Sequence, residues 1–204
     1  MLKRNRLIIL VAISLIFSQS ILAFNNKKTE NNSKIENEIE NCIDEFFAQK
    51  SVDFNILKRI FENYFSSSNI SDINSPIEKQ YLDILDFWEH PSKQFPLFAD
   101  KDYLIEIRKK LGFSEKDIIQ KKQLDCFTDK YIKYKCSIDT TSSIYAFGAT
   151  FETLRSMPNI GPNIVAGAIK MTMQKADMKK TLYQKSIVLL FCFDMTLYLK
   201  DEND

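Results

Sequence analysis

Apolar residues recur every three or four positions along most of this 204-residue chain. This spacing places side chains on one face of an α-helix, and it returns in segment after segment from Ser33 onwards. No stretch of any length alternates apolar and polar residues as an exposed strand would, and no repeat of 20 to 50 residues is visible. We therefore predict an all-α fold, a single-domain irregular helical bundle of about seven or eight helices.

Capping signals place several helix starts. The sequence SKIE at Ser33 is a capping box, Asp53 can cap a second helix, and SPIE at Ser75 combines an N-cap, a proline and a capping glutamate. Gly112 is expected to end a short helix, and SEKD at Ser114 to begin the next. The remaining helices are expected at 34–49, 101–111, 141–156, 162–175 and 177–199.

The last predicted helix is apolar almost all round at IVLLFCF, residues 187–193. A helix without a polar face is normally buried, so we expect it at the centre of the fold. Asp194 interrupts this segment, and a buried aspartate without a partner would be costly. We expect Asp194 to face solvent or a lysine.

The N-terminus has the pattern of an export signal. Three basic residues precede an apolar run from Leu7 to Phe17, a polar break follows, and Ala23 is a small residue suited to cleavage. We predict a signal peptide over residues 1–23, with an uncleaved membrane anchor as the alternative. Either way the protein is expected to be exported, to the periplasm or the cell exterior.

After the signal, residues 24–33 are expected to form a flexible lead and residues 34–204 one helical domain. About 180 residues suffice for a sizeable core. Without Lys3, Arg4 and Arg6 the 28 basic residues fall to 25 against 27 acidic ones, a net charge of about −2. The mature part should be soluble without a membrane span, and this charge gives no general attraction to nucleic acid or anionic lipid. Its distribution is uneven, because residues 155–185 are basic and residues 30–62 acidic.

The chain contains four candidate disulfide cysteines, Cys42, Cys126, Cys136 and Cys192. Disulfides form in exported proteins, and four cysteines allow three full pairings. Cys126 and Cys136 are the most local pair, but on one continuous helix they would lie roughly 15 Å apart, too far to bond. Residues 121–137 are therefore either one helix or a reversal that closes this pair.

The stretch RSMPNIGPNIVAGAIKMTM, residues 155–173, places two prolines and a glycine between apolar runs. It resembles the helix-hairpin-helix element, a small DNA-binding motif family. The resemblance implies that the amides around Asn159, Ile160 and Gly161, with Lys170 beyond, grip a DNA phosphate. Asn159 and Val165 depart from the small residues that the motif usually carries there. The alternative is a proline and glycine corner that ends one helix and begins the next.

His90 is the only histidine, and Asp86 lies four residues before it on the same helical face. A histidine with a carboxylate can bind a metal or act as a base. No second histidine, cysteine pair at metal spacing or glycine-flanked serine completes such a site. The alternative is a histidine that stabilises the C-terminal end of a helix.

The sequence thus favours a binding protein over an enzyme, without a cofactor, and the expected partner is another protein. Inhibitors of enzymes and immunity-type proteins that neutralise a toxin belong to this class, although no residue points to them specifically. DNA binding at residues 157–175 and hydrolytic or metal chemistry around His90 are the alternatives.

Overall fold

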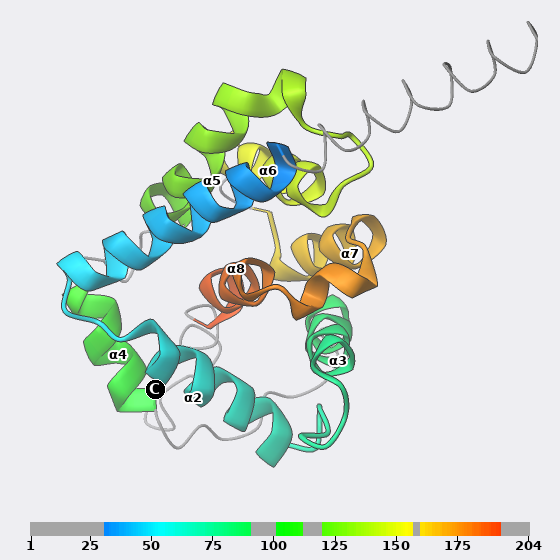
Figure 1. The fold of residues 1–204 in the computed structure, drawn as a ribbon. Coiled ribbons are helices and arrows are strands. Elements are labelled where there is room, and N and C mark those ends of the chain that lie inside the picture. Colours follow the sequence, from blue (N-terminus) through cyan, green and yellow to red (C-terminus); the bar gives the residue numbers. More distant parts are fainter. Residues whose placement is uncertain (1–30, 91–100, 112–119, 157–159, 193–204) are drawn as a thin grey trace, which may run out of the picture.

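The computed structural model describes residues 31–90, 101–111, 120–156 and 160–192. Within these ranges every regular element is a helix, which confirms the predicted all-α fold (Figure 1). The helices are residues 31–49, α2 (Phe54–Ser67), α3 (Ile77–Glu89), α4 (Lys101–Lys110), α5 (Gln120–Tyr134), α6 (Ser143–Ser156), α7 (Pro162–Thr172) and α8 (Thr181–Phe191). Two short 3₁₀ helices, η1 (Lys135–Ser137) and η2 (Lys175–Lys179), join α5 to α6 and α7 to α8.

Helix α8 lies in the middle of the described part of the molecule, as its composition predicted (Figure 1). Every residue from Leu182 to Phe191 is buried. Trp88 of α3 stacks on Phe191 at one side, and Phe147 of α6 packs on Tyr183 at another. The core therefore forms around α8, with aromatic side chains from helices distant in sequence.

The helix at residues 31–49 is tied to α5 by a disulfide between Cys42 and Cys126, whose Cα atoms are 5.6 Å apart. Because α5 runs unbroken to Tyr134, the chain does not reverse between Cys126 and Cys136. Cys136 is exposed and unbonded, and Cys192 is a free thiol in the core. Burial raises the pKa of the Cys192 thiol, as desolvation of its thiolate requires.

Helices α5, α6 and α7 form a layer that positions the candidate site. Helix α5 packs on α6, and α7 packs on both α6 and α3. Helices α5 and α6 cross closely at Gly148, where an added Cβ atom would overlap the ring of Tyr131. Glycine is thus required at this crossing for its small size.

Two predicted helix starts need correction. The helix expected from Ser33 is already formed at residue 31, so 31–33 belong to it and not to a flexible lead. Pro76, and not Ser75, is the N-cap of α3. The Ser75 hydroxyl donates instead to Asp72 Oδ2 at 3.3 Å, since Asp72 organises the turn before the helix.

The last two helices are shorter than predicted. Helix α7 ends at Thr172 and not near residue 175, because the amide of Gln174 donates to Ser143 Oγ at 3.0 Å and turns the chain toward α6. Residue 177 then lies in η2, so α8 begins only at Thr181. Expectations for Gly112, Ser114, Asp194 and the segment beyond Cys192 lie outside the described residues. No helix among the described residues combines the length and apolarity needed to cross a membrane.

Candidate functional site

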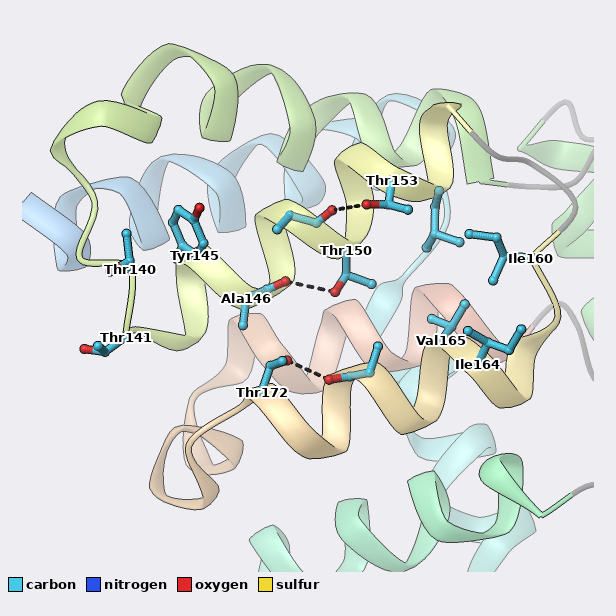
Figure 2. A pocket seen from close by; sticks show the side chains of 13 residues that line it. Thr140, Thr141, Tyr145, Ala146, Thr150, Thr153, Ile160, Ile164, Val165 and Thr172 are labelled. Atoms are coloured by element: carbon cyan, nitrogen blue, oxygen red, sulfur yellow. Dashed lines mark hydrogen bonds between the residues drawn. The ribbon is translucent and has the colours of Figure 1, made fainter.

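An open groove of about 440 Å³ lies between α6 and α7 (Figure 2). One wall comes from α6, where small residues recur at successive turns between Tyr145 and Leu154. The residues of this wall are Tyr145, Ala146, Ala149, Thr150, Thr153 and Leu154. The other wall is formed by Ile160 and by Ile164, Val165, Ala168 and Thr172 of α7, and residues 140 and 141 close one end.

The threonine hydroxyls of the walls are engaged by their own helices (Figure 2). Thr150 Oγ1 donates to the carbonyl oxygen of Ala146 at 2.9 Å, and Thr153 Oγ1 to that of Ala149 at 2.8 Å. On the facing wall, Thr172 Oγ1 donates to the carbonyl oxygen of Ala168 at 2.6 Å. These helical walls are therefore apolar in effect, although three threonines line them.

The solvent side of α7 extends this apolar surface. Ile164 is 62% exposed and Met171 is 82% exposed, and these are two of the four large apolar side chains exposed among the described residues. The core side of α7 is buried through Val165, Ala166 and Ile169. Helix α7 is thus apolar on both sides, which is typical of a helix covered on both sides.

The charged residues of α6 and α7 are all held in ion pairs. Lys170 Nζ lies 2.6 Å from Asp86 Oδ1 and 2.7 Å from Glu89 Oε2. Its hydrogen bonds to Asp86 and then to Glu89 raise the pKa of Lys170. Glu152 pairs with Lys135 at 3.1 Å, and Arg155 with Asp129 at 2.8 Å. Neither helix therefore offers an unpaired charge.

The helix-hairpin-helix resemblance falls partly on this groove. Ile160 lines it, and Gly161 is the N-cap of α7 with an extended backbone. Lys170, which the resemblance would place near a phosphate, is instead bound to two carboxylates. Asn159 and the proline before it lie outside the described residues, so the hairpin itself stays a prediction.

The structure brings His90 and Asp86 together at the end of α3. His90 Nδ1 lies 2.9 Å from the carbonyl oxygen of Asp86 and 3.9 Å from Asp86 Oδ1. Asp86, Glu89 and His90 each present one potential metal ligand, all within 4.8 Å of one another. The Lys170 ammonium already bridges the two carboxylates, so a metal ion would have to displace it. The arrangement is that of an ion-pair cluster between α3 and α7.

Acidic residues near the N-terminal end of the described chain form ion pairs with lysines of the basic segment. Glu36, Glu40 and Asp44 follow one another on the face of the 31–49 helix that meets the basic segment. Lys180 Nζ lies 2.9 Å from Glu36 Oε1, and Lys185 Nζ lies 3.0 Å from Glu40 Oε1. Two lysines of the basic segment are therefore neutralised by carboxylates of the acidic segment.

A second hollow, of about 690 Å³, lies over the turn that follows α2. Its polar groups are engaged locally, because Asp72 Oδ1 accepts the amide of Asn74 at 2.9 Å and Asp72 Oδ2 accepts the Ser75 hydroxyl. These hydrogen bonds, beginning with the Asn74 amide, lower the pKa of Asp72. The hydrogen bonds account for this turn without a ligand.

Sequence reasoning did not identify the α6–α7 groove. The available signals were the recurring Ala and Thr residues of α6 and the single charge among the eleven residues of α7. Comparison of the chain with protein-family models, with curated proteins and with solved structures finds no match.

Proposed function

We propose that this chain is an exported helical binding protein that takes an apolar segment of a partner protein into the α6–α7 groove. The observation that carries the proposal is the uncharged groove continued by exposed Ile164 and Met171. Exposed apolar surface of this kind is unfavourable in water and is typical of interaction sites. An inhibitor or immunity-type role is one form that such binding could take.

Two features support binding rather than catalysis at this groove. The thirteen residues that line the groove in the described part of the chain include no acid, base, histidine or cysteine, the groups that usually carry general acid–base chemistry or hold metal ions. The disulfide between Cys42 and Cys126 is in keeping with an oxidising compartment outside the cytosol. Together they support an exported protein whose function is recognition.

The proposal can be tested with two matched substitutions. Ala149→Trp places a large side chain in the groove, whereas Ala48→Trp adds the same side chain at an exposed position of the 31–49 helix. A photo-crosslinking amino acid at position 153, on the groove wall, reports what occupies it. The full chain, carrying each substitution in turn, is irradiated with extract of the exporting cell.

We expect one predominant protein to crosslink to the wild type and to Ala48→Trp, and to be lost with Ala149→Trp. Thermal unfolding of both variants checks that they remain folded. Crosslinking that is equal in all three proteins, or that yields no protein adduct from any, contradicts the proposal.

A further inference from the structure

We infer that the occupant of the α6–α7 groove is an amphipathic α-helix whose buried stripe carries large, uncharged apolar side chains. This inference rests on the function proposed above and names the partner's chemistry. It follows from the hydrogen-bonding capacity, the shape and the charge of the groove walls.

The hydrogen-bonding capacity of the walls favours a helix over an extended peptide. Every backbone N–H and C=O group of a bound segment that leaves water needs a hydrogen-bond partner. The three threonine hydroxyls of the helical walls already donate to their own helices, at 2.6 to 2.9 Å, and apart from the Tyr145 hydroxyl the other side chains along these walls are apolar. An extended peptide would leave its carbonyl groups without donors there. A helix satisfies its own backbone and needs none from the groove.

The shape of the groove suits the ridge of a third helix. Along α6 it runs from Tyr145 to Leu154, a rise of nine residues and therefore about 14 Å. Ala146 and Thr150 stand one turn apart on this wall, as do Ala168 and Thr172 on α7. Small side chains at successive turns leave room for large ones from a partner, at positions spaced by three and four residues.

The lack of unpaired charge on the groove walls argues against charged side chains in the partner's buried stripe. Among the described residues, the groove walls carry no ionisable acid or base other than the Tyr145 hydroxyl, and the three charged residues of α6 and α7 are already paired within the chain. A lysine or glutamate in the stripe would lose its hydration without gaining a partner. An acyl chain would suit the apolar walls equally well, but its carboxylate needs a cation, and neither helix offers an unpaired one.

Designed peptides of about 15 residues, the length at which isolated helices begin to form in water, test the inference. The first carries a leucine stripe on an alanine-rich helix, the second has the same composition with the stripe scrambled, the third has a central proline, and the fourth has one lysine within the stripe. Binding to the full chain is measured by fluorescence anisotropy. Palmitate competition and the sedimentation of the chain alone complete the experiment.

We expect the striped peptide to bind at least tenfold more tightly than the other three, with binding lost in Ala149→Trp and retained in Ala48→Trp. Equal affinity for the scrambled or proline peptide, or no binding of any peptide, overturns the inference. Displacement of the striped peptide by palmitate would instead assign an acyl chain, and a dimer that Ala149→Trp dissociates would assign a second copy. In each of these cases the crosslinking result above decides separately whether the groove binds a partner protein.

Discussion

Lys185 Nζ of α8 lies 2.6 Å from Asp44 Oδ1 of the 31–49 helix, although the lysine side chain is only 8% exposed. The same ammonium lies 3.0 Å from Glu40 Oε1. A buried charge depends on its partners, whereas the two carboxylates are partly hydrated. Loss of the carboxylates should therefore cost more stability than loss of the lysine charge.

Glu40→Gln combined with Asp44→Asn should lower the free energy of unfolding by about 3 kcal/mol, since it leaves the buried ammonium without a counter-charge. Lys185→Met removes the buried charge and keeps most of the side-chain volume, so it should cost less, about 1 kcal/mol. Urea denaturation of the three proteins measures both values. A larger loss from Lys185→Met than from the double substitution would contradict this account.

Removing the disulfide with Cys42→Ser and Cys126→Ser should lower the free energy of unfolding by about 4 to 5 kcal/mol, from the loss of an 84-residue loop constraint. Cys136→Ser is the matched control, because this thiol is exposed and unbonded, and it should change stability by less than about 0.5 kcal/mol. In the native protein a thiol reagent should label Cys136 and leave Cys192 unmodified. Rapid labelling of both would show that α8 is not buried as described.

Gly148→Ala should destabilise the protein by about 1 to 3 kcal/mol, because the added methyl group overlaps the Tyr131 ring and pushes α5 from α6. Gly167→Ala is the comparison within α7. Its Cβ would lie 3.2 Å from Glu89 Oε1, the end of a long side chain, and alanine favours the helix by about 1 kcal/mol. We expect the thermal midpoint of Gly167→Ala to stay near that of the wild type. A midpoint of Gly148→Ala that is not lower than that of Gly167→Ala would contradict this account.

Stability should fall as the pH rises above about 10. Burial raises the pKa of Tyr81 and Tyr183 above the value of 10.0 of a free tyrosine, and the carboxylates of Glu62 and Glu36 raise it further. Below pH 10 both tyrosines are protonated in the folded and the unfolded chain. Above it the unfolded chain loses their protons first, so unfolding is favoured by up to about 1.4 kcal/mol per pH unit for each tyrosine.

Thermal unfolding between pH 8 and pH 11 measures this loss, and absorbance at 295 nm should show tyrosinate appearing together with unfolding. Tyr183→Phe should flatten the decline, since one of the shifted groups is gone. A decline of unchanged slope in this variant would assign the alkaline sensitivity to other residues.

Lys170→Met should create a weak metal site from Asp86, Glu89 and His90, because it removes the ammonium that bridges the two carboxylates. Zinc binding, measured by calorimetry, should be at least tenfold tighter in Lys170→Met than in the wild type. Adding His90→Ala should reverse the gain. If the wild type bound zinc as tightly as the variant, Lys170 would not block the cluster, and Asp86, Glu89 and His90 would be a candidate metal site in the native protein.

The sequence allowed the fold class and most helices to be predicted, because periodicity and capping are local properties. The Asp53 carboxylate does cap α2, accepting the amide of Asn55 at 2.8 Å. Boundaries that depend on distant residues were wrong, as when Ser143 draws Gln174 out of α7. The partner of Cys42 also could not be inferred, since it depends on how helices far apart in sequence pack together.

The candidate site was harder to predict, because a groove is formed by two helices and not by a motif. In the sequence, Ala149 and Thr153 are only weakly apolar positions of α6. They become part of a groove because α7 packs beside α6. Conversely, two charged features that stood out in the sequence have partners within the described residues. Lys170 pairs with the carboxylates near His90, and Lys180 of the basic segment pairs with Glu36 of the acidic one.

The bond between Cys42 and Cys126 closes a covalent ring that contains α2, α3 and α4. A protease that cuts the chain once within this ring would therefore release no fragment. The nicked protein would keep its mass and migrate as one species without a reducing agent, and would separate into two pieces only after reduction. A molecule of this design can be cleaved in a protease-rich environment while the helices that form its groove stay attached to the rest of the chain.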